Sequence, residues 1–564
     1  MAVPALPPIL PSFKHPLEVV SSAPPPKRVR HIRSPNPLQI KPLGNLLFRP
    51  KQRFTRVNGL GTLGALPDEL LLSHIFGQLD GEDLVRIAGV SRAFFGWGHV
   101  EGIWKGVYIS KTQGRLLNWH GSWRSSYITT FLRPSYIPFS TPLPTSGITT
   151  PTHHSDVLFQ PSLCASFDPL PIFHSPSFTP TVPHISGLGL TPSTLPTTPC
   201  ILTDLMTTWA AMSPTFRRWT LDHLADRYQD IGMRAEATIT TLREYKEYHE
   251  RCEGDESPLY LFESDFVEKT KGKGKEGVGM GEDYQVPECF REDLFEVMGE
   301  ERPDYRWLIV GPLRSGSTWH QDPNGTSAWN AVTVGSKAWI MFHPSVTPPG
   351  VFVSEDQGEV EAPLSLAEWF ATYYKGAKAM YGSKAKDPAN RGKMLEGICN
   401  AGEIFFVPSG WWHIVINLAP SIAVTQNFVS SVELPTVLRF MRDRPEQVSG
   451  FKLRRSLPTS SSSAPTGEIE IVLGTGGLDD CDECVSGVYE KFCEALRREQ
   501  PNLGNVEGLL KEDWELEREG EKEKVKSVGV WEMVKSGEEA EEESGGFSFG
   551  FGGGEDLGEF LDEE

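Results

Sequence analysis

The chain has 564 residues, 39% hydrophobic and 23% charged, which is enough for about three domains with buried cores. No apolar run approaches the roughly 18–20 residues that a membrane span needs, and the proline-interrupted residues 1–16 lack the pattern of a secretory signal. Eight scattered cysteines exclude a disulfide framework and favour a reducing compartment. The net charge of −20 disfavours direct nucleic-acid binding but would attract a basic protein substrate.

The charge is concentrated at the two ends of the chain. Residues 1–60 hold ten basic residues and one acid, whereas residues 505–564 hold twenty acids and six basic residues. Both segments are predicted to be disordered. Residues 24–30, Pro-Pro-Pro-Lys-Arg-Val-Arg, are typical of a nuclear-import signal, with a solvated tail as the equal alternative. We therefore expect a nuclear protein, with the cytoplasm as a second location.

Residues 61–110 predict a compact array of helices. Pro67 and the two acids after it suit the first turn of a helix. Leu71, Ile75 and Leu79 then recur at the four-residue spacing of one helical face. An all-α structural subdomain is the simplest interpretation.

This segment also resembles an F-box, the domain that docks substrate adaptors on Skp1 in Skp1–cullin ubiquitin ligases. The resemblance rests on an opening Leu-Pro, a central Leu-x-x-Ile, a Val-Ser-Arg and a closing Trp in LPDELLLSHIFGQLDGEDLVRIAGVSRAFFGWGHVEGIWK, residues 66–105. It implies Skp1 as a partner of the chain.

Residues 284–440 are rich in Trp, Val, Ile and Phe, with turn signals about every eight to twelve residues, which predicts a β-sandwich or barrel. One helix is expected to interrupt the strands, opened by a capping box at 365–368, and another is expected near 489–498. The predicted organisation is a disordered basic segment (1–60), the F-box (61–110), a Pro/Ser/Thr-rich connection (111–200), the β-rich domain (201–445), a linker with a C-terminal helix (446–504) and a disordered acidic tail (505–564).

Three residues of the β-rich region have the pattern of a metal site. His320 and Asp322 are separated by one residue, so on a strand both side chains point to the same face. His413 begins another strand-like run after Pro-Ser-Gly-Trp-Trp. Two imidazoles and one carboxylate on adjacent strands make a facial triad, which leaves three metal positions open, as non-haem Fe(II) oxygenases require. A lone His is usually structural, but the combination is much more specific.

The open metal positions need a chelating cosubstrate, whose remote carboxylate needs a cation. Lys337, on the next predicted strand, is the natural partner for such a carboxylate. The alternative is a lysine that faces solvent. The apolar neighbours Val334, Ala338 and Trp339 favour partial burial and hence the ligand role.

Taken together, these segments resemble the JmjC-domain Fe(II)/2-oxoglutarate oxygenases, and most closely the branch of Jumonji domain-containing protein six. The matching blocks are YRWLIVGPLRSGSTWHQDPNGTSAWN (305–330), GSKAW (335–339), FVPSGWWHIVINLAPSIAVTQNF (406–428), SPLYLFESDF (257–266) and YQVPECFREDLF (284–295). The resemblance implies an α+β fold, in which a helical F-box precedes a double-stranded β-helix, the cupin-like jelly roll. It also implies Fe(II) and 2-oxoglutarate as cofactors. With the F-box, the layout is similar to fungal and plant F-box/JmjC proteins.

The resemblance implies roles for further residues, with the triad above holding the iron. Lys337 would pair with the far carboxylate of 2-oxoglutarate, and Thr425 would add a hydroxyl to it. Asn330 would lie near the chelating end, and Tyr260 would reach the cosubstrate from the segment before the barrel. Ser317 stands where the family commonly has Thr, and it keeps the hydroxyl.

Strand alternation adds two supporting residues. Asn417 shares the face of His413, and Asn427 shares the face of Thr425. Six tryptophans are expected in the barrel core rather than in a cage for methylated lysine: Trp307, Trp319, Trp329, Trp339, Trp411 and Trp412.

The favoured function is 2-oxoglutarate-dependent oxidation of a basic protein, such as a histone or splicing-factor tail, by lysyl hydroxylation or arginine demethylation. The first alternative is a non-catalytic F-box adaptor whose barrel binds a target for ubiquitylation. The second is a small-molecule or RNA-modifying oxygenase of related fold. A complete triad with Lys337 favours catalysis, because a binding-only barrel does not need these residues. Since the F-box-like pattern lies outside the barrel, we expect deletion of residues 60–110 to abolish co-purification with Skp1 but to leave turnover of a peptide largely intact.

Overall fold

The computed structural model describes residues 59–132, 164–452 and 487–510, apart from residues 216, 275–276, 355–357, 364, 504 and 507. The chain divides into two compact units, Met1–Val488 and Tyr489–Glu564. None of the helices in the described ranges is long and apolar enough to cross a membrane. The basic cluster at 24–30, and nearly all of the two segments predicted to be disordered, lie outside the described residues.

Residues 59–132, the helical module, form an array of short helices. Asp80 caps α3 by accepting a hydrogen bond from the Asp83 backbone N–H at 2.9 Å, and Ser91 caps α4 in the same way. The array continues to Leu132 and so extends beyond the predicted boundary at residue 110. Its elements are η1 (Gly61–Ala65), α2 (Asp68–Leu70), η2 (Leu71–Ile75), η3 (Phe76–Gln78), α3 (Gly81–Ala88), α4 (Arg92–Trp97), α5 (Glu101–Thr112), α6 (Trp123–Tyr127) and η4 (Ile128–Leu132).

The β-rich domain is built on two main sheets, as a cupin-like jelly roll requires. The first has the order β1 (His184–Ser186), β2 (Cys200–Thr203), β13 (Ile404–Val407), β8 (Ser327–Val334), β15 (Ser421–Phe428), β6 (Arg306–Gly311), β5 (Leu261–Glu263), β3 (Gly232–Ala235) and β4 (Thr238–Thr241). The second has the order β12 (Met394–Asn400), β9 (Ser336–Phe342), β14 (Trp412–Asn417) and β7 (Gly316–His320). A separate hairpin pairs β10 (Phe352–Val353) with β11 (Val360–Glu361).

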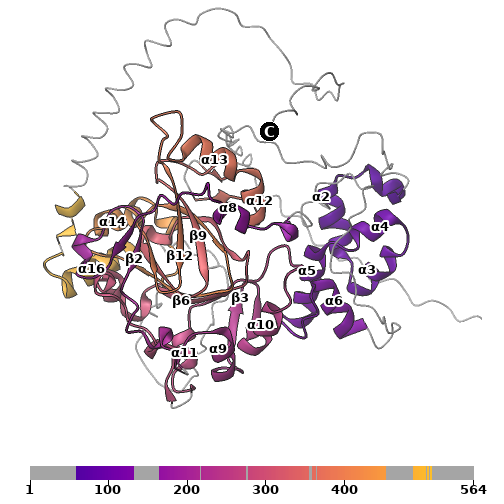
Figure 1. Cartoon of the computed structure of the whole chain (residues 1–564), viewed down its shortest axis with the longest axis horizontal. Helices are drawn as coiled ribbons and strands as arrows, with labels where there is room; N and C mark the ends of the chain where they lie inside the picture. The colour runs from indigo at the N-terminus through magenta and orange to yellow at the C-terminus, as the bar shows by residue number, and fades with distance from the viewer. Residues whose placement is uncertain are drawn as a thin grey trace, which may run out of the picture. The chain divides into compact units, whose positions relative to one another are not determined.

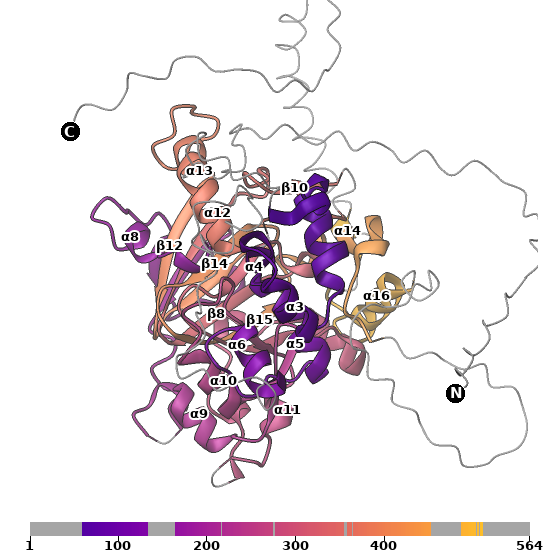
Figure 2. The ribbon, with the colours of Figure 1, turned by 90° about the vertical axis from the view of Figure 1, so that its right-hand side faces the viewer.

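The two main sheets pack face to face through a shared apolar interior. Val332 and Phe405 from the first sheet contact the same cluster as Trp339, Met341 and Val415 from the second. The outer face of the second sheet is covered by α8 (Leu170–Phe173), α12 (Leu366–Thr372) and α13 (Tyr374–Tyr381), whose aromatic side chains pack on β9 and β14. Figure 1 and Figure 2 show these helices beside β9, β12 and β14.

The remaining described helices flank the strands. They are η5 (Pro192–Thr194), η6 (Ala210–Met212), α9 (Leu221–Arg227), α10 (Leu242–His249), α11 (Phe266–Thr270), η8 (Met280–Glu282), η9 (Glu288–Phe290), η10 (Leu294–Glu301), η11 (Pro323–Gly325), α14 (Leu434–Asp443) and η12 (Pro445–Gln447). The helix α16 (Val488–Glu499) is not one of them, since all but its first residue belongs to the second unit. The helices predicted after Ser365 and near 489–498 are therefore present, and Ser365 caps α12 by accepting from the Glu368 backbone N–H.

Two features differ from the sequence expectations. A second helix, α13, follows α12 directly, because Tyr374 and Lys378 on α13 reach the buried carboxylate of Glu396 on β12 at 2.5 and 2.9 Å. The first sheet also begins before residue 201, since β1 runs parallel to β2. Both features depend on contacts between distant segments, which local pattern does not encode.

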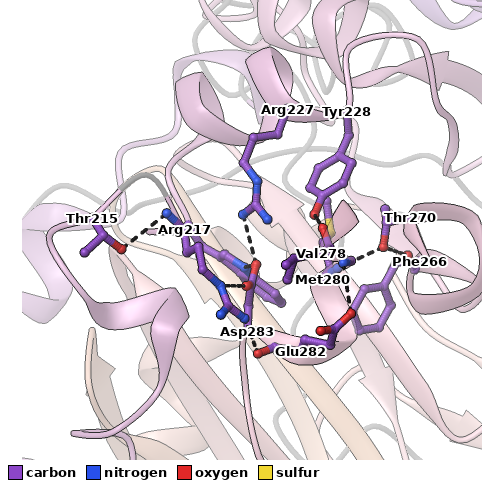
Figure 3. A network of polar contacts seen from close by, with 12 residues as sticks. Thr215, Arg217, Arg227, Tyr228, Phe266, Thr270, Val278, Met280, Glu282 and Asp283 are labelled. Carbon is purple, nitrogen blue, oxygen red and sulfur yellow. Dashed lines mark hydrogen bonds and ion pairs between the residues drawn. The ribbon is translucent and has the colours of Figure 1, made fainter. Parts of the chain in front are cut away.

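A buried carboxylate ties α9 to the segment before the barrel. Asp283 is 1% exposed and accepts hydrogen bonds from Arg217 Nε at 2.7 Å, Trp219 Nε1 at 3.0 Å and Arg227 Nη1 at 3.0 Å. Figure 3 shows the two arginines meeting at Asp283. Within the described residues, Arg227 has no other ion-pair partner, and its Nε and Nη2 are buried without hydrogen bonds.

Replacing Asp283 with Ala should lower the free energy of unfolding by about 3–5 kcal/mol, because it leaves the buried Arg227 charge without a partner. The control is Glu288→Ala, which removes an exposed pair with Arg291 at 2.7 Å and should cost less than about 1 kcal/mol. Urea unfolding of the full chain, followed by tryptophan fluorescence, measures both. Equal stability of the two variants would contradict the view that Asp283 stabilises the fold through its buried contact with Arg227.

Candidate metal and cosubstrate site

His320, Asp322 and His413 lie together where β7 ends and β14 begins. Antiparallel pairing of these strands sets His320 directly opposite His413. Asp322 follows the end of β7 in extended backbone, just before η11. One ligand atom of each residue lies within 4.8 Å of the other two. The structure thus brings the three predicted residues together, although Asp322 lies beyond the strand rather than on it.

A glycine allows β7 to approach β14. A Cβ atom on Gly316 would lie 1.9 Å from the carbonyl oxygen of Val415. Any side chain at this position would push the strands apart. Since His320 lies on the same short strand, the absence of a side chain at Gly316 is a condition for the pairing of the two histidines.

The two imidazoles are oriented by backbone carbonyls. His320 Nδ1 lies 2.6 Å from the Thr318 carbonyl oxygen, and His413 Nδ1 lies 3.1 Å from that of Trp411. Because a carbonyl only accepts, each Nδ1 carries the proton and each Nε2 keeps its lone pair for a metal. Burial, together with the nearby His320, holds the pKa of His413 well below its ordinary value, so His413 is neutral, the form that binds metals.

The carboxylate of Asp322 is only partly satisfied. Its Oδ1 accepts a hydrogen bond from Asn427 Nδ2 at 3.2 Å, which places the predicted supporting residue against the cluster. Its Oδ2 is buried and has no hydrogen-bond partner among the described residues. Burial raises the pKa of Asp322. A buried oxygen without a donor beside two imidazole lone pairs fits a divalent cation.

Lys337 is completely buried in β9. Its Nζ donates to the Tyr260 hydroxyl at 2.7 Å and to Asn417 Oδ1 at 2.9 Å. Both partners are neutral, and within the described chain Lys337 has no carboxylate partner. Burial therefore lowers the pKa of Lys337 to about 7. The carboxylate of a bound anion would supply the missing charge, so these three residues fit one end of 2-oxoglutarate. Burial is more complete than the partial burial expected from the sequence.

Asn330 and Thr425 face each other across β8 and β15. Asn330 Oδ1 is buried without a hydrogen-bond partner in the described residues, so it can accept a hydrogen bond from a bound molecule. Thr425 Oγ1 donates to the Trp329 carbonyl at 2.8 Å. A donor role of Thr425 toward a carboxylate therefore requires its hydroxyl to turn.

A cavity of about 870 Å³ opens beside the cluster. Its lining includes His320, Ser317 and Tyr260, which connects it to the metal and cosubstrate residues. Phe262 and Trp307 also line it and stack with ring centroids 5.3 Å apart. Trp307 is half-buried, which corrects the expectation that it belongs to the barrel core. The other five tryptophans of that prediction are buried: Trp319, Trp329, Trp339, Trp411 and Trp412.

Sequence reasoning missed other residues that line the cavity. Phe262 lies two residues after Tyr260, and this alternation could have placed it on the same face. Lys105 and Glu256 also line the cavity. No local signal marks them, because Lys105 comes from α5 of the helical module.

Comparisons with known proteins identify the family of the chain. Residues 193–433 match the model of the cupin-like domain family. The arginine-specific demethylase JMJ22 of Arabidopsis thaliana is 39% identical over 424 residues, 74% of this chain and 78% of that protein. The chain belongs to the JmjC family of iron- and 2-oxoglutarate-dependent oxygenases.

The chain is also similar to two further JmjC proteins. The lysine-specific demethylase JMJ21 of Arabidopsis thaliana is 31% identical over 67% of the chain and 38% of that protein. The bifunctional arginine demethylase and lysyl-hydroxylase psr-1 of Caenorhabditis elegans is 33% identical over 49% of the chain and 68% of that protein. The JmjC family predicted from the sequence motifs is confirmed, whereas the similarity to these relatives does not show an F-box.

Binding of 2-oxoglutarate to this JmjC site should weaken as pH rises. Below pH 7, Lys337 is already charged in the free protein. Above pH 7, binding must take up a proton to charge it, so affinity should fall about tenfold per pH unit. From about pH 6.5 to about pH 8.5, the dissociation constant should rise roughly twentyfold. Anaerobic titration with Fe(II), followed by the charge-transfer absorbance of the complex, measures it.

The control for this titration is Lys337→Met, which keeps the side chain long but removes the titrating amine. It should bind 2-oxoglutarate more weakly at low pH and show little pH dependence over the same range. A wild-type affinity independent of pH would contradict the view that Lys337 is the titrating cation.

Proposed function

We propose that this oxygenase acts on a basic residue of a protein substrate, with His320, Asp322 and His413 as the iron ligands. The observation that carries the proposal is the combination of these three ligand atoms within 4.8 Å with the buried Lys337, which has only neutral partners in the described chain. A barrel that only binds a protein target would gain nothing from an amine whose pKa is lowered by burial.

The bound iron and 2-oxoglutarate would supply oxidation of a substrate C–H bond, coupled to conversion of 2-oxoglutarate into succinate and CO₂. The chain's own residues orient these groups. Lys337, held by Tyr260 and Asn417, neutralises the far carboxylate. Asn427 holds one oxygen of Asp322 and leaves the other for the metal. Asn330 would orient the cosubstrate near its chelating end.

The reaction proposed first is arginine demethylation, with lysyl hydroxylation as the second outcome. Arginine demethylation is in the names of both JMJ22 and psr-1, and lysyl hydroxylation is in that of psr-1. Hydroxylation on an N-methyl carbon ends in loss of formaldehyde, whereas hydroxylation on a chain carbon is stable. Mass spectrometry of methylated-arginine and lysine peptides from histone and splicing-factor tails distinguishes the two reactions, because demethylation removes about 14 mass units and hydroxylation adds about 16. The proposal would be rejected if no peptide showed either mass change.

His320→Ala, Asp322→Ala and His413→Ala should each abolish succinate formation from 2-oxoglutarate and lower the iron content of the purified chain, because two ligands are too few to hold Fe(II). The matched control is His343→Ala, since His343 is exposed at the end of β9 and bonds Ser345 instead. Circular dichroism checks the fold of each variant. Wild-type turnover in any triad variant would exclude that residue as a ligand.

We further propose that the helical module binds Skp1 and that the protein is nuclear. The F-box resemblance is supported by exposed apolar side chains on the module: Leu70 at 41%, Val90 at 67% and Phe95 at 44%. The basic cluster at 24–30 supports nuclear import.

The double variant Leu70→Asp/Val90→Asp should reduce capture of the chain by immobilised Skp1 at least tenfold, roughly 1.4 kcal/mol or more, because charged groups replace apolar contact. Leu188→Asp is the control, since Leu188 is equally exposed (69%) but lies outside the module. Undiminished capture of the double variant would show that Skp1 does not use this face.

A further inference from the structure

The helical module and the β-rich domain share one apolar core. A single cluster of contacting buried side chains includes Trp104 and Trp123 of the module together with Leu308 of β6. Trp119 packs edge-on against Tyr248 of α10, with ring centroids 4.7 Å apart. The module is therefore part of the same folded unit as the barrel, which differs from the expectation that it is separable.

Polar contacts fix α5 of the module at the edge of the cavity. Lys105 Nζ lies 2.9 Å from Glu236 Oε2, and both residues line the cavity. Nearby, the Ile239 N–H of β4 donates to the Gly114 carbonyl at 2.7 Å, and the Ile239 carbonyl accepts from the Leu116 N–H at 3.2 Å. These bonds hold the end of α5 against the β3–β4 hairpin, so the module contributes to the cavity wall.

The module also holds the segment that leads to Tyr260. Trp123 Nε1 donates to Asp255 Oδ2 at 3.2 Å, and Asp255, only 4% exposed, accepts a second bond from the Tyr248 hydroxyl at 2.9 Å. Residues 251–260 are thus clamped between the module and α10. Glu256 lies within this segment, so its position is set by the same clamp.

The charges of the cavity are unevenly satisfied. Three of its four lining carboxylates have a lysine partner: Glu236 with Lys105 at 2.9 Å, Glu263 with Lys269 at 2.7 Å and Asp304 with Lys452 at 2.6 Å. Glu256 is the fourth. It makes no ion pair or hydrogen bond within the described part of the chain.

Glu256 is half-buried against α5. Its Oε1 lies 4.0 Å from the position that a Cβ on Gly102 would take. Burial, and secondarily the charge of Asp255, raises the pKa of Glu256 to about 7. An arriving cation would offset the cost of this partly desolvated carboxylate, which is the condition under which a charge-assisted hydrogen bond is strong.

We propose that α5 of the helical module is a wall of the substrate cleft, and that Glu256, held against this wall, receives the positively charged end of a substrate side chain. This assignment rests on the proposed function, because it places the substrate in the cavity that contains His320 and Tyr260. Lys105 disfavours binding of a cationic substrate, because it neutralises Glu236 and places a positive charge in the same cavity. The chain therefore selects its substrate with residues from both the barrel and the module.

The test measures binding of two fluorescein-labelled peptides to the full-length chain by anisotropy. One peptide repeats Gly-Ser-Arg-Lys, and the other repeats Gly-Ser-citrulline-acetyllysine, which keeps the shape and removes the charge. Glu256→Gln should weaken binding of the cationic peptide at least about tenfold, while Lys105→Ala should strengthen it about threefold or more. The controls are Glu247→Gln on α10 and Lys111→Ala on α5, which replace exposed residues outside the cavity lining and should bind as wild type does.

The opposite signs of the two cavity variants distinguish charge recognition from a general structural defect. Unchanged binding in Glu256→Gln, weaker binding in Lys105→Ala, or wild-type binding of both peptides with equal affinity would each overturn the assignment. Succinate formation by the wild-type chain is measured separately. If the charge ranking holds but no 2-oxoglutarate is consumed, the cleft assignment stands and the proposed oxygenase function fails.

Discussion

The register between β7 and β14 is the constraint on which the candidate site depends. This register sets His320 opposite His413. It depends on Gly316, because a side chain there would collide with the Val415 carbonyl oxygen. A slip by one residue would turn one imidazole to the other face of the sheet. The bulge between His413 and Val415 confines the irregularity to the residues that follow the ligand.

Strand β14 also joins the predicted metal residues to the predicted cosubstrate residues. β14 pairs with β9 so that Asn417 lies opposite Lys337, four residues along the strand from His413. On a pleated strand this spacing keeps both side chains on one face. The metal end and the carboxylate end of the site are therefore positioned by one rigid sheet, and the geometry between them follows from register rather than from loop conformation.

Lys337 shows how the site trades folding stability against ligand binding. A fully buried amine with a hydroxyl and an amide as partners is costly when charged, and burial accordingly lowers its pKa to about 7. The tyrosine and asparagine cannot remove this cost, because neither carries a formal charge. A bound carboxylate can, because it stabilises the charged amine. The burial of Lys337 therefore lowers the stability of the free protein but favours binding of the cosubstrate.

Much of the site could be predicted from the sequence because its residues follow strand periodicity. His320, Asp322, His413 and Lys337 are on or beside strands, where alternation decides which face a side chain takes. The cavity wall could not be predicted in this way. Lys105 and Glu256 both line the cavity because a shared core brings together segments more than a hundred residues apart. Trp307 of β6 lines the same cavity and is therefore only half-buried.

The shared core also changes what the F-box resemblance can mean. A helical adaptor joined by a linker would leave the barrel intact when removed, whereas here Trp104, Trp123 and Leu308 belong to one buried cluster. Removing the module would expose the barrel side of that cluster to water, at about 25 cal/mol for each Å² of apolar surface. It would also release Asp255 from Trp123, and with it the segment that carries Tyr260 to Lys337. The proposed partner, if docked on the outer face of the module, would thus be connected to the cosubstrate site by packed, hydrogen-bonded structure rather than by a flexible tether.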